Sequence, residues 1–301
     1  MTYNNITKNI KSKNDVNIPF YKLKIAKWFV ITNATVLLTM IILSGACRQP
    51  AFMLIFLFGA IFPFFQLFFS KFLAKNSHDI EIIGEDIQGE KENELVEMIN
   101  AMSAKVGISN PPEVGIYQSE DMNAFATGFT KNSSLIAFSS GLLNKMDSEE
   151  ISAVAAHEIA HIANGDMITM TLIQSAVNII VMLCTIPLKI YYWFSDDDNW
   201  IYDILLFVAE IILSVILMFL GNLVVKAFSR RREFEADKLA SEITSNNYMI
   251  NALTRLNEAD EVELSQSEKA NACFKISAEE SFLDIFSTHP SLERRIKALK
   301  Q

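Results

Sequence analysis

Three residues in the middle of the chain have the types and spacing of a metal site that does chemistry. His157 and His161 are four positions apart, so on a helix their side chains lie on one face. Two imidazoles at this spacing bind one Zn²⁺, and Glu158 projects beside them toward whatever the ion holds. The pattern predicts zinc chemistry of the hydrolytic kind. The alternative is a buried helix that carries two hydrogen-bonded histidines.

The segment around these residues has the start and stop signals of a helix. Asp147, followed three positions later by Glu150, is typical of an N-cap with a capping box. Asn164 and Gly165 are typical of a helix end. We therefore expect one uninterrupted helix between these limits.

A catalytic zinc site needs a third protein ligand and an open position for water. In the metzincins a third histidine follows soon after the helix, but here Asn164 and Met167 occupy the positions that this spacing requires. Glu233 is the better candidate, since it lies on a predicted helix with Asp237 one turn later on the same face. In thermolysin-like zinc enzymes a second acid at this place accepts a hydrogen bond from a ligand histidine. We expect Glu233 as the third ligand and Asp237 as the acid that orients a histidine. The alternative is an exposed pair of helix charges.

The composition predicts a membrane protein that does not bind nucleic acid. Of 301 residues, 50% are apolar, 22 are Phe and only 20% are charged, and the mean hydropathy is +0.23. An ordinary soluble enzyme is less apolar, so the excess should lie in membrane spans. The net charge of −9 leaves no basic face for phosphates, which excludes nucleic acid as a partner. The three cysteines are far apart and share no ligand spacing, which fits a reducing compartment.

Four apolar segments are long enough to cross a bilayer core of about 30 Å. They are 28–46, 51–70, 168–193 and 204–225. Lys and Arg gather before the first segment, after the second and after the fourth, whereas the connecting loops hold one arginine or none. By the positive-inside rule, all the large polar segments face the cytoplasm. Glu210, inside the fourth segment, should face other protein or water, either as a functional group or as a polar contact between helices.

The polar segments predict a soluble α+β domain made of two pieces. The second piece, from 226 onward, is helical and charged, and it carries the expected third ligand. The fold class we expect is a mainly α membrane protein, with four transmembrane helices and a zincin-like, thermolysin-type catalytic domain that holds a small β-sheet. The expected divisions are 1–75 (tail and first membrane hairpin), 76–166 (first catalytic piece), 167–225 (second membrane hairpin) and 226–301 (second catalytic piece). In the first piece we expect a strand at 79–86, a helix at 90–106, a strand at 113–117, and a hairpin that turns at 131–133 and ends in a strand at 135–138.

The ordered set of motifs resembles the HtpX-type membrane metalloproteases, in the broader family that includes the type I CAAX prenyl proteases. The likeness covers nearly the whole chain, including its four apolar segments. The motifs that carry it are Asn123-Ala124-Phe125-Ala126-Thr127-Gly128, His157-Glu158-x-x-His161, Ser229-Arg230-Arg231-Arg232-Glu233-Phe234-x-Ala236-Asp237, and Ser287-Thr288-His289-Pro290 followed by Arg295-Ile296.

The resemblance implies a zinc-dependent endopeptidase of the bacterial inner membrane, with one Zn²⁺ per chain and an active site on the cytoplasmic side. Its implied role is stress response and quality control. The implied partners are the lipid bilayer, misfolded membrane proteins or unfolded polypeptides as substrates, and other membrane quality-control proteases.

The residues also suggest how such an enzyme would work. Zinc lowers the pKa of its bound water and polarises the scissile carbonyl, and Glu158 is expected to act as general base and then as general acid. His289 is the expected donor to the developing oxyanion, with Arg295 in support, a role that rests partly on the resemblance. The alternative for His289 is a His-Pro turn that starts a helix.

The stretch Asn123-Ala124-Phe125-Ala126 is expected to bind the substrate. An exposed strand there would pair with the backbone of a peptide by β-augmentation, which suits an enzyme that is loose about side chains. The alternative is an ordinary hairpin edge.

Two other functions stay open at this point. One is a CAAX-type processing peptidase that cuts only prenylated tails, although four spans are few for a large helical chamber. The other is a non-catalytic membrane scaffold with a structural zinc. An intact Glu158 and a site with three protein ligands are both unfavourable to the scaffold, since structural zinc sites are usually closed by four ligands.

Overall fold

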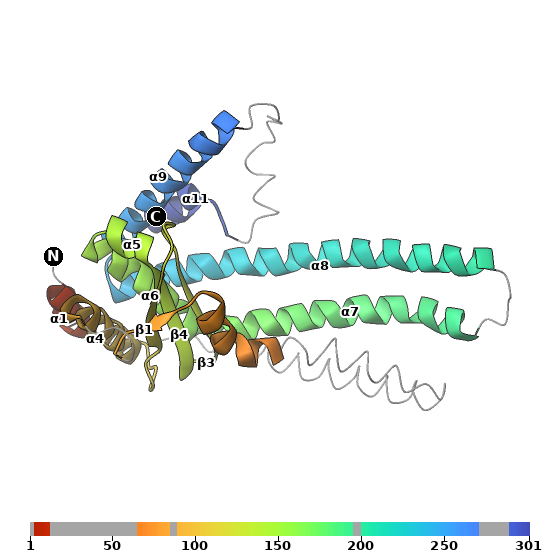
Figure 1. Cartoon of the computed structure of the whole chain (residues 1–301), viewed down its shortest axis with the longest axis horizontal. Coiled ribbons are helices and arrows are strands. Elements are labelled where there is room, and N and C mark those ends of the chain that lie inside the picture. Colours follow the sequence, from red (N-terminus) through yellow and green to blue (C-terminus); the bar gives the residue numbers. More distant parts are fainter. Residues whose placement is uncertain (1–2, 13–64, 85–88, 195–199, 271–288) are drawn as a thin grey trace. The chain divides into compact units, whose positions relative to one another are not determined.

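The protein is mostly helical with one small mixed sheet (Figure 1). The computed structural model describes residues 3–12, 65–84, 89–194, 200–270 and 289–301. The expected span 28–46 and most of 51–70 lie outside the described residues, so only the second pair of expected spans is visible here.

The chain divides into two compact units. The first combines Met1–Pro19, Leu67–Ile168 and Ser229–Gln301, and the second combines Phe20–Gln66 with Thr169–Phe228. The first unit therefore joins segments that are separated in sequence by long apolar stretches.

The sheet belongs to the first unit and has the strand order β1-β2-β4-β3. Strands β1 (Glu81–Ile82) and β2 (Glu113–Tyr117) are antiparallel, and β2 is parallel to β4 (Ser133–Ser139). Strand β3 (Ala124–Thr130) pairs antiparallel with β4 in a hairpin around the expected turn. Of the strand expected over 79–86, the described residues, which reach Gly84, form the two-residue strand β1. In the described residues β3 thus lies at one edge of the sheet.

The hairpin contains a bulge that requires glycine. The register between β3 and β4 shifts between Gly128 and Thr130, and Gly128 has a φ of 142°. A Cβ at Gly128 would lie 2.3 Å from the carbonyl oxygen of Ser133. Any other residue would therefore strain the backbone and clash with the partner strand.

The helices of the first unit surround a core on one face of this sheet. They include α4 (Glu90–Lys105), α5 (Ser140–Lys145), α6 (Ser148–Asn164), α9 (Asn246–Ala270) and α11 (Leu292–Leu299). Helix α6 is buried along almost its whole length, and its alanines pack into the same core as α4 and α9. Small side chains allow this close packing from several sides.

The limits of α6 confirm the helix signals read from the sequence. Asp147 is the N-cap, its side chain accepts from the backbone N–H of Glu149 and Glu150, and the reciprocal bond of the capping box is present. Gly165 ends the helix in the left-handed conformation, with φ at 66°. A glycine adopts this conformation without steric cost.

The N-terminal segment is more ordered than its polar sequence indicates. Helix α1 (Tyr3–Ser12) buries Ile6 and Ile10, which are four residues apart, against α4. The Lys105 ammonium on α4 donates to the carbonyl oxygen of Ile10 at 3.2 Å. The described part of the tail is therefore part of the first unit.

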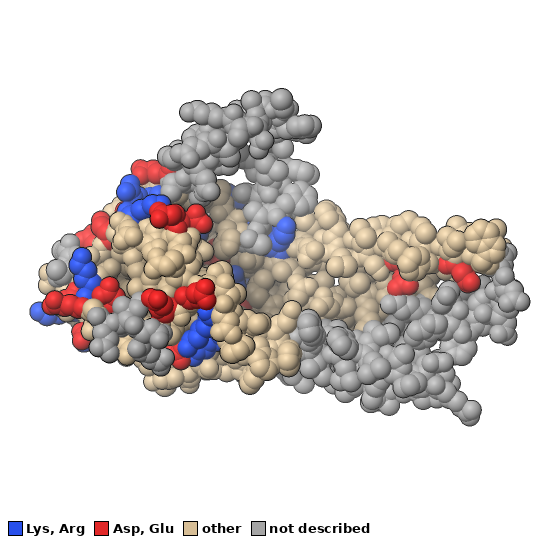
Figure 2. All heavy atoms as spheres, in the orientation of Figure 1, with Lys and Arg blue, Asp and Glu red and all other residues tan. Residues whose placement is uncertain are grey.

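Two long helices carry the apolar stretches of the second unit. They are α7 (Asp166–Phe194) and α8 (Trp200–Ile243), and both are long and apolar enough to cross a membrane. They run side by side (Figure 1), and at Gly221 they approach so closely that a Cβ would lie 2.2 Å from a methyl of Val177. Figure 2 shows acidic and basic side chains gathered over the first unit, whereas the visible surface of α7 and α8 is mostly uncharged.

Helix α8 continues past the apolar stretch without a break. The sequence predicted a span that ends at Val225 and a helical, charged segment from 226 onward, and one helix of 44 residues joins the span to the start of that segment. Its last part, from Ser229, belongs to the first unit and carries Glu233 and Asp237.

Candidate metal centre

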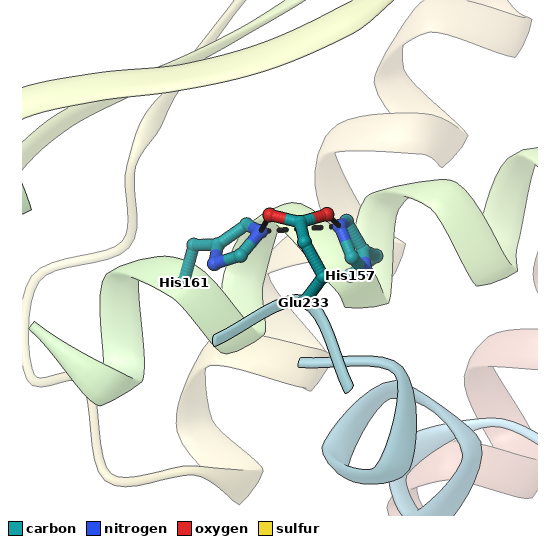
Figure 3. Close-up of side chains that lie close together, drawn as sticks. All are labelled: His157, His161 and Glu233. Atoms are coloured by element: carbon teal, nitrogen blue, oxygen red, sulfur yellow. Dashed lines mark hydrogen bonds and ion pairs between the residues drawn. The ribbon is translucent and has the colours of Figure 1, made fainter. Parts of the chain in front are cut away.

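The two histidines of α6 and one glutamate of α8 come together in the first unit. The Nε2 atoms of His157 and His161 are 3.1 Å apart. The Glu233 carboxylate lies between the two imidazoles (Figure 3), with Oε2 at 3.5 Å from His157 Nε2 and Oε1 at 3.5 Å from His161 Nε2. One ligand atom from each residue lies within 4.8 Å of the others, and all three residues could share a metal ion.

The burial of these atoms fits a cation. Glu233 is 1% exposed, and neither of its carboxylate oxygens accepts a hydrogen bond. A buried carboxylate without hydrogen bonds is costly unless a positive charge or a metal compensates it. Two imidazole nitrogens and a carboxylate oxygen are ligands that Zn²⁺ prefers, and three protein ligands leave a position for water. The residues present therefore fit a catalytic zinc ion.

His157 is oriented by an acid from α8. Its Nδ1 lies 2.9 Å from Asp237 Oδ1, so we assign the proton to Nδ1, which leaves the Nε2 lone pair toward Glu233 and His161. Arg295 of α11 donates to both Asp237 oxygens, from Nε at 2.8 Å and from Nη2 at 2.6 Å. Asp237 therefore lies where it can accept a hydrogen bond from His157.

The charges around His157 change several pKa values. Burial lowers the pKa of His157, but its contacts with the Asp237 and Glu233 carboxylates outweigh burial and raise the pKa to about 9. Burial raises the pKa of Asp237, but its bonds to Arg295 and His157 lower it below its usual range. Asp237 is thus held as an anion, which can keep the proton on the far side of the His157 ring.

His161 is oriented by Asp166, an acid outside the motifs read from the sequence. Its Nδ1 lies 2.8 Å from Asp166 Oδ2, and Asp166 is 2% exposed. Arg232 Nε of α8 lies 3.9 Å from Asp166 Oδ2. The signal in the sequence is an acid directly after Gly165. A left-handed glycine turns the chain back, so the residue that follows it can meet a side chain of the last helical turn.

Glu158 lies next to the first histidine on α6 and is 9% exposed. Its charge is close enough to help raise the pKa of the Arg295 guanidinium, after Asp237 and Glu233 and against the lowering effect of burial. Glu158 is thus beside the three possible ligands and is not one of them.

His289 and Arg295 take different places. The His289 side chain is 62% exposed, and its Nδ1 lies 3.0 Å from Glu233 Oε2. Arg295 is 7% exposed, and its shortest contacts are with Asp237. Arg295 is thus held against Asp237, and its expected support of His289 at the developing oxyanion stays a prediction. Burial raises the pKa of Glu233, but His157 and His289 lower it more, to far below its usual range.

The expected substrate strand lies beside α6. Ala124 and Ala126 on β3 pack against the same core as α6. Phe125 points to the other side of the sheet, where its ring contacts those of Tyr117 and His78. Asn123 is tied by its backbone, since its N–H donates to Ser139 Oγ and its carbonyl accepts from Ser139 N–H.

Comparison with known proteins finds proteases that match most of the chain. The model of peptidase family M48 matches residues 89–301. Protease HtpX of Wigglesworthia glossinidia brevipalpis is 39% identical over 292 residues, which cover 91% of this chain and 96% of that protein. The Protease HtpX homologs of Fusobacterium nucleatum and Bacillus subtilis are each 37% identical, and they cover 92% and 90% of this chain and 91% and 97% of their own lengths.

A solved structure shows a similar fold. The crystal structure of S. mikatae Ste24p superposes with a TM-score of 0.61 at 18% identity, over 97% of this chain and 68% of that chain. The family model and the relatives together cover the metal centre and the elements that hold it. The chain belongs to peptidase family M48 and is a metalloprotease of the HtpX type.

Proposed function

We propose that the protein is a zinc-dependent endopeptidase in which His157, His161 and Glu233 hold one Zn²⁺ and Glu158 is the general base. The observation that carries the proposal is the Glu233 carboxylate, buried between two imidazole Nε2 atoms without a hydrogen bond. Zinc-dependent hydrolysis of a peptide requires three protein ligands, an open position on the metal for water, and a nearby glutamate that is not itself a ligand.

Bound zinc supplies a Lewis acid that activates water and polarises the peptide carbonyl. Glu158 accepts the proton of the attacking water and delivers it to the leaving amine. His289 is exposed on the open side of Glu233, and it donates to the carbonyl oxygen as negative charge develops there. Asp237 and Arg295 hold His157 in the tautomer whose Nε2 is free to bind the metal.

The substrate backbone is bound at the edge of the sheet. Strand β3 has β4 on one side and lies at the edge of the described sheet, so an extended peptide can add to it through backbone hydrogen bonds. The segment Asn123-Ala124-Phe125-Ala126 runs beside α6, which supports its assignment to substrate binding. Backbone pairing explains a protease with little preference for side chains.

The enzyme acts at a membrane. Helices α7 and α8 can each span a bilayer, and the basic residues that flank the apolar segments favour four spans with the catalytic pieces in the cytoplasm. We place the protein in the bacterial inner membrane, with misfolded or damaged membrane proteins and unfolded polypeptides as its substrates. A CAAX-type processing peptidase is the alternative, so the substrate for the tests is an unprenylated, unfolded polypeptide such as casein.

The substitution Glu158→Gln in the full-length protein in detergent tests the mechanism. The amide keeps the size of the side chain but cannot accept the proton, so zinc content should stay at one per chain while cleavage falls by about 10²- to 10⁴-fold. Glu149→Gln, on the same helix and away from the ligands, is the control and should leave cleavage unchanged. Cleavage at the wild-type rate in zinc-loaded Glu158→Gln would refute the role of Glu158. Chelator-insensitive cleavage by the wild type would refute the zinc mechanism itself.

A further inference from the structure

We propose that Asp166 is a positioning residue of the metal centre, which orients His161 as Asp237 orients His157. The inference rests on the proposed function, because it assigns Asp166 a role toward the zinc ion that the two histidines would hold. Neither the sequence motifs nor the spacing of the ligands pointed to this residue.

The contact is short, buried and directed at the correct atom. Asp166 Oδ2 lies 2.8 Å from Nδ1 of His161, and the side chains are 3% and 12% exposed. The other ring nitrogen, Nε2, faces Glu233 and His157. A carboxylate at Nδ1 holds the proton there, so the lone pair of Nε2 is left for a metal.

The backbone at the junction of α6 and α7 presents Asp166 to the ring. Gly165 closes α6 in the left-handed conformation, with its N–H donating to the carbonyl oxygens of His161 and Ile162. Asp166 is then the first residue of α7. A left-handed glycine turns the chain back on itself, so this position directs the Asp166 carboxylate toward the last turn of α6.

The two histidines are supported in the same chemical manner by unrelated segments. His157 contacts Asp237 of α8, and the charge of Asp237 is balanced by Arg295. His161 contacts Asp166 of α7, and Arg232 of α8 lies within 3.9 Å. The full unit on each side is a histidine, a buried carboxylate and an arginine. The same arrangement on both sides is expected if the two carboxylates serve to fix the orientation of the two histidine ligands.

The consequence is a measurable contribution to metal affinity. Carboxylates that hydrogen-bond to metal-binding histidines fix the tautomer and the ring orientation, and their removal weakens binding or activity by about 10- to 100-fold. Asp166→Ala should therefore bind zinc about 10- to 100-fold more weakly than the wild type. Asp166→Asn keeps a neutral acceptor at the same place, so its affinity should lie between the two.

The experiment measures zinc affinity of the full-length protein in detergent by competition with a chromophoric chelator. Asp147→Ala is the matched control, because it removes a different aspartate, the N-cap at the other end of α6. It should lower thermal stability through the lost cap and leave zinc affinity unchanged. If Asp166→Ala does not fold, as judged by its thermal transition, the affinity of Asp166→Asn decides.

A second readout reports on the proposed role directly. The chain has only four histidines, so ¹⁵N spectra of imidazole-labelled, zinc-stripped protein are simple enough to assign by substitution. In the wild type His161 should be protonated at Nδ1, and in Asp166→Ala the Nε2-protonated form should appear. A purely structural role would leave this signature unchanged.

The outcomes separate the inference from the function on which it rests. Wild-type zinc affinity in a folded Asp166→Ala, or an unchanged His161 tautomer, would overturn the role of Asp166 while leaving the zinc site intact. A wild-type protein that binds no zinc would overturn both. Weaker zinc binding together with the change of tautomer, in the absence of an effect of Asp147→Ala, supports the inference.

Discussion

The two sides of the metal centre use the same groups but hold them differently. On the side of His157, Arg295 donates two hydrogen bonds to Asp237, at 2.6 and 2.8 Å, and its side chain is 8% exposed. On the side of His161, Arg232 Nε is 3.9 Å from Asp166, and the Arg232 side chain is 23% exposed. On the His157 side two short hydrogen bonds from an arginine hold the acid, whereas on the His161 side the contact between Arg232 and Asp166 is a longer ion pair.

The difference follows from how far apart the contributing segments are in the sequence. The His157 side joins α6, α8 and α11, and Arg295 lies 138 residues from His157. The acid of the His161 side comes only five residues after its histidine. A local acid is placed by the turn itself, but a distant one must be fixed by strong directional bonds. The tight arginine is thus found where the chain offers no local constraint.

The Glu233 carboxylate is the point at which the two sides meet. Its Oε2 faces His157, His289 and Arg295, and its Oε1 faces His161 and Arg232, with distances between 3.0 and 3.7 Å. Because Glu233 contacts both histidines, its loss should disrupt metal binding on both sides equally.

The largest expected effect is therefore that of Glu233→Ala. The variant should lose stoichiometric zinc after dialysis, measured by atomic absorption, and casein cleavage should fall to background. Glu235→Ala on the same helix, which removes a surface ion pair with Arg231, is the control and should keep both. Stoichiometric zinc in Glu233→Ala would point to His289 as the third ligand and would make the His157 side dominant.

His289→Ala tests whether the exposed histidine adds chemistry to the His157 side. If His289 donates to the developing oxyanion, kcat should fall by about 10²- to 10³-fold, while zinc content stays at one per chain. His78→Ala is the matched control, since His78 is also exposed but its ring makes tilted contacts with Tyr117 and Phe125 at the other face of the sheet. An unchanged kcat in His289→Ala would mean that His289 has no catalytic role and only forms part of the turn that precedes α11.

The parts of the fold that the sequence predicted are those with local signals. The capping box at Asp147, the glycine stop at Gly165 and the turn between β3 and β4 are each specified by neighbouring residues, and all three are found. The pairing of Glu233 with the histidine helix was also within reach, because ligand number and chemistry require a third donor.

The parts that the sequence did not predict depend on physical features that hydropathy does not report. Polarity changes at Val225, but the following residues contain no Gly or Pro, so α8 continues through the change. The lysines of the N-terminal tail indicated only a polar segment, although Ile6 and Ile10 have the spacing of a buried helix face. The Asp237–Arg295 pair spans 58 residues, and no arginine indicates its partner from the sequence alone.

A matched pair of substitutions gives the smallest and sharpest test of the comparison between the two sides. Lysine keeps the charge of arginine but cannot donate two parallel hydrogen bonds to one carboxylate. Arg295→Lys should lose at least one bond to the buried Asp237, which costs about 1.5–3 kcal/mol for a bond to a charged group. Arg232→Lys should cost only about 0–1 kcal/mol, as expected for a partly exposed ion pair without hydrogen-bond geometry.

The measurement for this pair is urea unfolding of chelator-treated full-length protein, followed by zinc affinity of the same two variants. Without zinc, the difference between the variants reports on the arginines alone. With zinc, Arg295→Lys should also weaken binding, because a mobile Asp237 no longer fixes the His157 ring. Equal losses of stability in the two variants would mean that the short contacts at Arg295 contribute no more than the 3.9 Å contact at Arg232. The two sides would then be equivalent, and the distance along the chain between histidine and acid would carry no energetic consequence.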